Sequence, residues 1–168
     1  MESIINQYSV FAFSGSRNCP DCAEAVTAFV PFVPKGSGVL VGDCSGVDRC
    51  VRTAFRQANV FWAAYYGGIL PRRSAAVVEA CVEANGLFCA FPSGKCPQSV
   101  TPSPSVRACF KGGGSGTWAS LALAIGQRCA CLVCVHPHMA PLWLVNRAVW
   151  LGGSFWYVSA QSVPTEIW

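Results

Sequence analysis

The chain has 168 residues, enough to bury a substantial core within one domain. Hydrophobic residues make up 52% of the chain and charged residues 12%, which excludes a disordered protein and predicts self-association, because few charges remain to solubilise the surface. The net charge of +4 comes from basic residues scattered along the sequence, a distribution that suits a small anionic ligand better than a nucleic acid.

The first half of the sequence predicts strands that alternate with helices. Short β-prone apolar runs are each followed by a turn and then by apolar residues at helical spacing. The predicted strand and helix pairs are 9–14 with 22–30, 39–43 with 47–58, and 60–65 with 72–84. Glycine-containing turns, among them Gly15 and 42–46, separate the first two strands from their helices.

The second half continues the alternation. The unbroken apolar run 87–91 predicts a central strand that is buried on both faces. A Pro- and Ser-rich loop over about 92–111 follows, longer than most connections and of a kind that often serves as a lid or a family-specific insertion. The remaining predicted elements are a helix at 118–127, a strand at 129–135, a helix or loop at 142–151 and a strand at 154–158.

These elements predict a single α/β domain over 1–168, Rossmann-like, with a mostly parallel sheet flanked by helices on both faces. No apolar stretch gives the ~20 uninterrupted residues of a membrane span, and residues 1–7 lack the pattern of a signal peptide, so we expect a cytoplasmic protein. The 11 cysteines lie mostly within apolar runs, where they are expected to act as small buried hydrophobes.

The most informative segment is the glycine run from Lys111 to Thr117, which precedes the apolar helical stretch beginning at Trp118. Glycines allow several backbone N–H groups to converge where a helix presents its unsatisfied donors and the positive end of its dipole. This arrangement is typical of a phosphate site.

Four segments in order resemble the SLOG superfamily, the Rossmann-like group that contains the DprA and LOG lysine-decarboxylase-like proteins. They are Phe13-Ser14-Gly15-Ser16-Arg17, the run from Val41 to Asp48, Leu70-Pro71-Arg72-Arg73-Ser74, and Gly113-Gly114-Ser115-Gly116-Thr117. The match is closest to the small YspA/YpsA-like branch and covers roughly 9–135. It implies a protein that binds a nucleotide, a nucleotide-derived ligand or a nucleic acid, without a cofactor or metal.

The resemblance also implies roles for individual residues. Phosphate would lie on Gly114, Ser115, Gly116 and Thr117, with Gly15, Ser16 and Arg17 opposite. Asp43, Ser45 and Asp48 would contact ribose or base, Arg73 would complement the ligand's charge, and Trp118 is placed to stack on a base. Tyr65 or Tyr66 is a second candidate for stacking, although core packing remains an alternative for each of these aromatics.

The chain departs from the hydrolases of this superfamily at two places. Where LOG-type enzymes have Pro and Glu, it has Gly112 and Ser120, and serine cannot supply the carboxylate that glycosidic cleavage requires. We therefore expect sensing or sequestration of a nucleotide-derived signal, as in phage–host conflict, by a homo-oligomer. The alternatives are a phosphoribohydrolase that uses Asp43, Asp48 and Arg73, and a single-stranded nucleic-acid binder.

Other clusters favour structural roles. Cys131 and Cys134 lie three apart in a predicted strand, so their side chains point to opposite faces and cannot share a metal. Cys19 and Cys22, at a turn, could bind a metal or take part in redox chemistry, and His136 and His138 could approach each other, but each pattern is also typical of ordinary loops. Arg49, Arg52 and Arg56 are spaced three and four apart, which predicts a shared, solvated helix face. The alternative is that Arg49, next to Asp48 at the helix start, turns toward the ligand edge.

Overall fold

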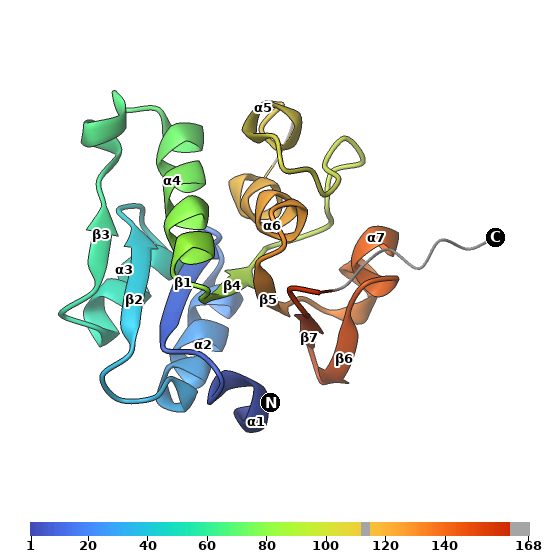
Figure 1. Ribbon diagram of the computed structural model, residues 1–168, viewed down its shortest axis with the longest axis horizontal. Coiled ribbons are helices and arrows are strands. Elements are labelled where there is room, and N and C mark those ends of the chain that lie inside the picture. Colours follow the sequence, from blue (N-terminus) through green and yellow to red (C-terminus); the bar gives the residue numbers. More distant parts are fainter. Residues whose placement is uncertain (112–114, 162–168) are drawn as a thin grey trace.

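A seven-stranded sheet of order β3-β2-β1-β4-β5-β7-β6 forms the centre of the molecule in the computed structural model, which describes residues 1–111 and 115–161 (Figure 1). The strands are β1 (Val10–Gly15), β2 (Gly38–Gly42), β3 (Asn59–Phe61), β4 (Leu87–Phe91), β5 (Ala130–Cys134), β6 (Val149–Gly152) and β7 (Phe155–Val158). Strands β1 to β5 run parallel, whereas β7 is antiparallel to both β5 and β6. The predicted α/β fold with a mostly parallel sheet is confirmed.

Helices cover both faces of the sheet. On one face, α1 (Glu2–Ile5), α2 (Pro20–Phe29) and α3 (Val47–Ala54) pack on β-strand residues such as Phe11 and Phe13. On the other face, α4 (Leu70–Glu83), α5 (Val106–Cys109) and α6 (Gly116–Gly126) pack on Ala12 and Phe88. Strand β4 is therefore buried along its whole length, as its unbroken apolar sequence predicts.

Strand order places a topological switch between β1 and β4. From β1 the chain moves through α2 to β2 and then through α3 to β3, and α4 afterwards carries it back to β4 on the other side of β1. In open parallel sheets, ligands bind at the carboxyl ends of the strands where the order reverses in this way. A ligand site is therefore expected at the carboxyl ends of β1 and β4.

Two predicted elements end differently. The strand expected over 60–65 stops at Phe61, because its partner β2 ends at Gly42, opposite Phe61, and Ala63–Tyr66 then forms the 3-10 helix η2. The helix expected over 47–58 ends at Ala54. The region 142–151 contains both the short helix α7 (Leu142–Val145) and the start of β6. Two further 3-10 helices are η1 (Val30–Phe32) and η3 (Pro137–Met139).

The long loop 92–111 is fastened to α6. The Trp118 indole N–H donates to the Gly94 carbonyl (3.2 Å), and the Ser103 N–H donates to the Ala122 carbonyl (3.3 Å). A side chain at Gly126 would collide with the backbone of Ser103, so the close approach of loop and helix requires glycine there. The loop packs as part of the layer formed by α4, α5 and α6.

Several large apolar side chains are exposed at the C-terminal part of the sheet. Leu142 and Val145 on α7, with Val149 and Trp150 on the edge strand β6, are all exposed. Within residues 1–111 and 115–161, no helix combines the length and the apolar character that crossing a bilayer requires.

Candidate functional site

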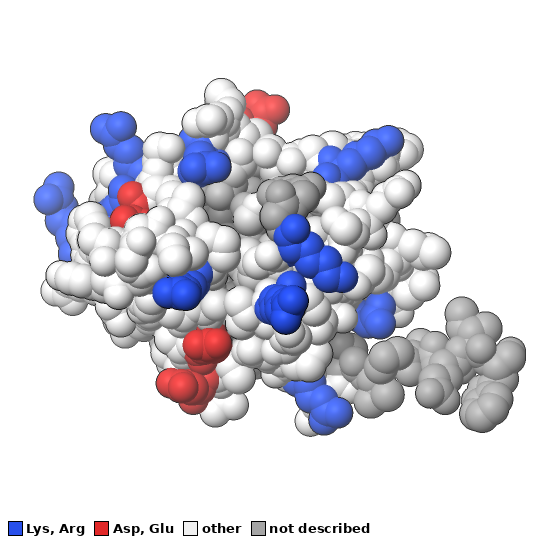
Figure 2. Space-filling view, turned by 90° about the horizontal axis from the view of Figure 1, so that it is seen from above, with Lys and Arg blue, Asp and Glu red and all other residues white. Residues whose placement is uncertain are grey.

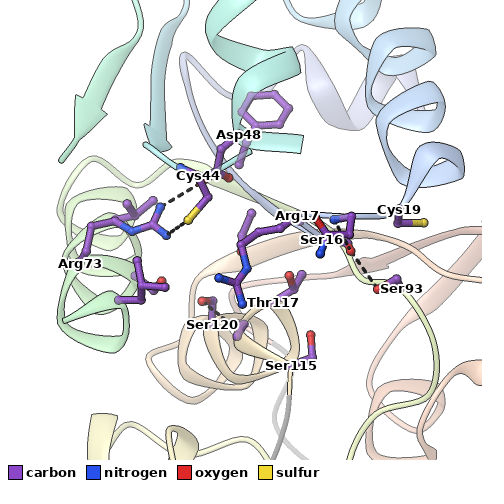
Figure 3. Close-up of a pocket in the computed structure, with 18 of the residues that line it drawn as sticks. Ser16, Arg17, Cys19, Cys44, Asp48, Arg73, Ser93, Ser115, Thr117 and Ser120 are labelled. Carbon is purple, nitrogen blue, oxygen red and sulfur yellow. Dashed lines mark hydrogen bonds and ion pairs between the residues drawn. The ribbon is translucent and has the colours of Figure 1, made fainter. Parts of the chain in front are cut away.

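A cavity of about 640 Å³ opens at the switch between β1 and β4 (Figure 3). Most of its walls come from the loop after β1, the first turn of α6 and the inward side of α4. Asp48 of α3 and residues that follow β2 and β4 complete the lining. Of the predicted ligand-binding residues, those that line it are Gly15, Ser16, Arg17, Asp48, Arg73, Ser115, Gly116 and Thr117. Segments that lie about a hundred residues apart in the sequence are thereby brought to one site.

The loop after β1 is held by contacts on both sides. The Ser16 carbonyl accepts a hydrogen bond from the Val47 N–H (3.1 Å), and the Ser16 N–H donates to the Phe91 carbonyl at the end of β4 (3.1 Å). Gly46, with φ +69°, lies against the backbone of Ser16 and Arg17, where a side chain would not fit. This loop is consequently fixed between α3 and β4, and Arg17 extends from it into the cavity (Figure 3).

The first turn of α6 forms the opposite wall. Ser115 is its N-cap residue and makes no capping hydrogen bond through its side chain with any described residue. The first N–H groups of an α-helix have no partner within the helix, and here they face the cavity at the positive end of an 11-residue helix. A Cβ added at Gly116 would meet no atom of the described residues within 4 Å. Gly112 and Gly114 lie outside the described residues.

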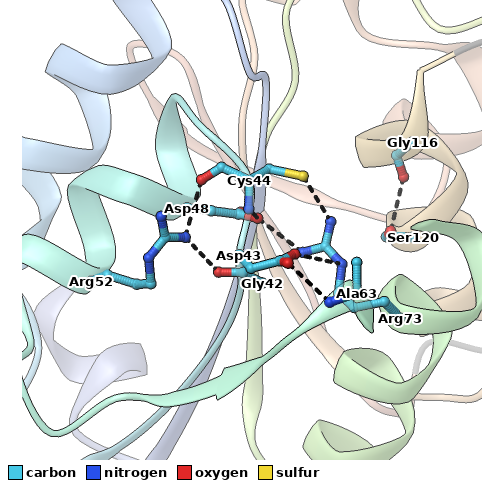
Figure 4. Close-up of polar contacts among 9 residues, drawn as sticks. All are labelled: Gly42, Asp43, Cys44, Asp48, Arg52, Ala63, Arg73, Gly116 and Ser120. Carbon is cyan, nitrogen blue, oxygen red and sulfur yellow. Dashed lines mark hydrogen bonds and ion pairs between the residues drawn. The ribbon is translucent and has the colours of Figure 1, made fainter. Parts of the chain in front are cut away.

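A buried ion pair closes the inner end of the cavity (Figure 4). Nη1 of Arg73 lies 2.9 Å from Oδ2 of Asp48, and its Nη2 donates to Sγ of Cys44 (3.2 Å). Only 8% of the Arg73 side chain and 6% of the Asp48 side chain is exposed. Gly42, at the end of β2, makes this possible, since a side chain there would occupy the position of the guanidinium group.

Burial raises the pKa of Asp48 above the usual aspartate value, and the charge of Arg73 and the N–H of Cys44 offset part of this effect. Nearby, Arg73 Nε and Asp43 Oδ1 lie 3.9 Å apart, and within the described part of the chain neither has a hydrogen-bond partner. Among the described residues, Arg73 thus retains one donor and Asp43 one acceptor that no hydrogen bond satisfies.

Three of the predicted ligand residues that the structure describes do not line the cavity: Asp43, Ser45 and Trp118. Asp43 is directed away from it, and its Oδ2 accepts a hydrogen bond from the Ala63 N–H (2.9 Å), which positions η2. Ser45 is exposed, and its hydroxyl donates to the Arg17 carbonyl (3.3 Å). Asp43 and Ser45 both support the loops around the cavity rather than forming its surface.

Trp118 does not line the cavity and instead takes the core-packing role that the sequence left open for it. Its side chain is completely buried, in an edge-to-face contact with Trp143 at 6.0 Å between ring centroids. Thr117 faces the cavity, and Trp118, one residue further along the helix, points into the core. Tyr65, at 83% exposed, is also outside the cavity, as is Tyr66.

The structure adds residues that the sequence did not single out as ligand contacts. Cys19, Cys44 and Ser74 line the cavity, and so does Ser93, whose hydroxyl donates to that of Ser16 (3.0 Å). In the sequence, only their positions after strands or at the start of helices could have indicated that they line the cavity. The apolar part of the lining includes Leu70, Val77 and Phe88.

The remaining clusters have local roles. Cys131 and Cys134 pack on opposite faces of the sheet, as predicted. His136 and His138 stack at 5.0 Å between ring centroids on the surface, and no group of three or more His, Cys, Asp or Glu among the described residues is arranged to hold a metal ion. Arg52 was expected to be solvated, but it donates to the carbonyls of Gly42 (2.7 Å) and Cys44 (3.0 Å) and so fixes the turn after β2 (Figure 4).

Basic side chains are spread over the face seen in Figure 2, where they outnumber acidic ones without forming a continuous stripe. Comparisons of the chain with known protein families, curated protein sequences and solved structures found no match.

Proposed function

We propose that the cavity binds a nucleotide or nucleotide-derived signalling molecule, and that the protein senses or sequesters this ligand without efficient catalysis. The observation that carries the proposal is the convergence of Arg17, Arg73 and the uncapped first turn of α6 on one cavity at the switch between β1 and β4. Cations and free N–H donors recognise an anion, and this position is where parallel sheets bind ligands.

The phosphate is assigned to the first turn of α6. Thr117 and Ser115 place hydroxyl groups beside the free N–H groups, and Arg17 extends into the same cavity from the opposite wall. Gly116 contributes no side chain, so an anion can approach the backbone closely.

The sugar and base are assigned to the rest of the cavity. A volume of about 640 Å³ lies within the range of small-molecule sites. Leu70, Val77 and Phe88 offer apolar surface, while the hydroxyls of Ser74 and Ser93 offer hydrogen bonds. This mixture suits a heterocyclic base joined to a polar sugar. The resemblance of four sequence segments to the SLOG superfamily supports the same assignment.

Two contacts support binding over catalysis. The hydroxyl of Ser120 donates to the Gly116 carbonyl of its own helix (2.8 Å), so it is already committed to a local hydrogen bond. The Asp48 carboxylate is paired with Arg73. A group that activates water must be free to take a proton from it, and an ion-paired carboxylate is poorly suited to that task.

One observation favours the alternative, a hydrolase that cleaves the glycosidic bond of a nucleoside monophosphate. Asp48 is the acidic residue among the described residues that line the cavity, and its pKa is raised by burial, as in carboxyl groups that act as general acids. Asp43, the other candidate carboxylate, lies outside the lining.

Incubation with a panel of ligands tests both functions. Purified protein is mixed with nucleoside monophosphates, cyclic nucleotides and ADP-ribose derivatives, binding is measured by calorimetry, and the ligand is recovered and analysed by mass spectrometry. Tight binding with intact ligand supports the proposal. Release of free base or ribose phosphate, lost in Asp48→Asn, establishes the hydrolase instead.

Gly116→Asp tests the location of the phosphate. It places a negative charge in the first turn of α6, in open space, so binding is expected to fall at least tenfold while the protein stays folded. Gln57→Asp adds the same charge on the exposed turn after α3, outside the cavity lining, and is the matched control. Equal affinity in the two variants would place the ligand elsewhere.

We also propose that copies of the chain associate through the apolar surface of α7 and β6. Leu142 and Val149 are 73% and 63% exposed, and β6 is an edge strand whose outer side is open to pairing. Sedimentation of Val149→Lys, which places a charge on that edge, should show a smaller species than the unmodified protein.

A further inference from the structure

The first turn of α2 holds two cysteines in a defined relation. Cys19 is the N-cap residue, Pro20 occupies the first helical position, and the backbone N–H of Cys22 donates to Sγ of Cys19 (3.3 Å). Both thiols are free. The pair therefore lies across one turn at the positive end of a 10-residue helix, with one sulfur already accepting a backbone hydrogen bond.

The two sulfurs differ in their access to solvent. Cys19 is half-buried and lines the rim of the cavity (Figure 3). Cys22 is 8% exposed and packs in the core with Val26 and Phe29. Burial, followed by its hydrogen bond to Cys19, raises the pKa of Cys22 to about 12, so this thiol keeps its proton at neutral pH. Cys19 is thus accessible from the cavity, whereas Cys22 is buried in the core.

We propose that Cys19 and Cys22 form a reversible dithiol–disulfide pair that exchanges with the disulfide of a small thiol at the rim of the cavity. Cβ atoms three apart on a regular helix lie about 5–6 Å apart, so the pair must close by about 1–2 Å to reach the ~3.8 Å typical of a disulfide. Cys19 can contribute to this movement because it is the N-cap residue, with an extended backbone outside the regular helix. A C-x-x-C spacing at a helix N-terminus is also a setting in which cysteine thiols are reactive.

The reaction proceeds in two steps. Cys19 loses its proton and attacks one sulfur of the small disulfide, which forms a mixed disulfide on Cys19 and releases one small thiol that takes up a proton. Cys22 then loses its proton, attacks Sγ of Cys19 and releases the second small thiol, again protonated. In total, two thiols of the protein pass two electrons to the small disulfide and become the Cys19–Cys22 disulfide.

A second pair shows why access matters. The sulfurs of Cys81 and Cys129 lie 3.7 Å apart, but these residues are only 0% and 5% exposed. A co-reactant cannot reach either sulfur in the folded protein. Of these two pairs, the one in α2 has a sulfur at a cavity open to solvent. The inference depends on α2 alone and not on the ligand proposed for the cavity.

Mass spectrometry can test the inference directly, because trypsin releases residues 18–35 as one peptide whose only cysteines are Cys19 and Cys22. The native full-length chain is equilibrated with mixtures of reduced and oxidised glutathione, and free thiols are then alkylated under denaturing conditions. We expect the doubly alkylated peptide to be replaced by an unalkylated, disulfide-linked one as the oxidised fraction rises, and to return on reduction. A peptide that stays doubly alkylated in excess oxidised glutathione, or that links to other cysteine peptides, overturns the inference.

Variants separate the two steps. Cys22→Ala should stop at the first step, with one glutathione held on Cys19. Cys19→Ser keeps a side chain that can cap α2 and should hold no glutathione on the 18–35 peptide. Cys50→Ser, a change in a half-buried cysteine of α3 outside this cavity, is the control and should form the Cys19–Cys22 disulfide as the unmodified chain does. Glutathione uptake by this peptide in Cys19→Ser would contradict the assigned order. If Cys22→Ala does not fold, the peptide from the unmodified chain still decides the result.

Discussion

Arg73 of α4 and Asp48 of α3 form an ion pair that joins helices on opposite faces of the sheet. The 2.9 Å contact between Nη1 and Oδ2 passes over the end of β2, where Gly42 leaves the space that the guanidinium group fills. The pair therefore holds together two layers that the sheet otherwise separates, and it forms the inner end of the cavity.

Removal of the carboxylate should be costly. Asp48→Ala leaves the Arg73 guanidinium buried without its acceptor, and we expect the free energy of unfolding to fall by about 3–5 kcal/mol. Asp48→Asn keeps an acceptor for Arg73 and for the Cys44 N–H, so its loss should be much smaller. Urea denaturation measures both, and equal losses would show that the ion pair contributes little.

Gly42→Ala, at the end of β2, should disturb the ion pair between Arg73 and Asp48. The added methyl group would occupy the position of the Arg73 guanidinium, and overpacking of this kind typically costs about 1–3 kcal/mol. Gly38→Ala is the control in the same strand, where the nearest atom is Val10 Cγ2 at 3.3 Å. Thermal unfolding should show a larger drop for Gly42→Ala, and the reverse order would contradict this account.

The titration of Asp48 should contribute to the pH dependence of the free energy of unfolding. Because burial raises its pKa in the folded protein above the unfolded value of about 3.9, the folded state keeps this proton to a higher pH than the unfolded chain does. Its contribution is therefore fully present below the unfolded pKa and is lost as pH rises through the folded pKa. Relative to Asp48→Asn, which does not titrate, the unmodified protein should lose stability across that window. A relative gain with rising pH would show that Arg73 outweighs burial.

Trp118→Phe tests whether this aromatic ring belongs to the core. The variant loses the hydrogen bond from the indole N–H to the Gly94 carbonyl and leaves a small void, so we expect a loss of about 1–3 kcal/mol. The affinity for whichever nucleotide the calorimetric panel identifies should not change. A weaker affinity at unchanged stability would instead show that Trp118 contacts the ligand.

Sequence periodicity was sufficient for the fold. The unbroken run Leu87–Phe91 and the alternation of strands with helices determine that the sheet is parallel and covered on both faces. The ends of the elements were harder to predict from the sequence, because they depend on the partner strand. Strand β3 stops at Phe61 because β2 ends opposite it. The antiparallel direction of β7 likewise follows from a hairpin with β6 that the helix-or-loop prediction for 142–151 did not resolve.

The candidate site was only partly accessible from sequence. Residues directly after strands or at the start of helices, such as Arg17 and Thr117, were placed at the cavity by topology. The direction of the side chains could not be predicted from topology. Successive side chains on a helix are rotated by about 100° about its axis, so Thr117 faces the cavity while Trp118 faces the core. Asp43 shows the same limit, because its carboxylate turns to the Ala63 N–H of η2.

The attachment of the loop 92–111 to α6 bears on how a ligand enters and leaves. Gly94 near the start of this loop and Ser103 in its middle are both bonded to α6, and the hydroxyl of Ser93 donates to that of Ser16 in the loop after β1. Displacement of the loop would break all three hydrogen bonds, each typically worth about 0.5–1.5 kcal/mol, so these contacts oppose its opening as a lid. With the loop held in this way, the proposed ligand would exchange past exposed side chains at the mouth, such as Arg17, which rotate on the picosecond to nanosecond timescale of surface rotamers. The residence time of a ligand would then be set by the strength of its contacts and not by a gate.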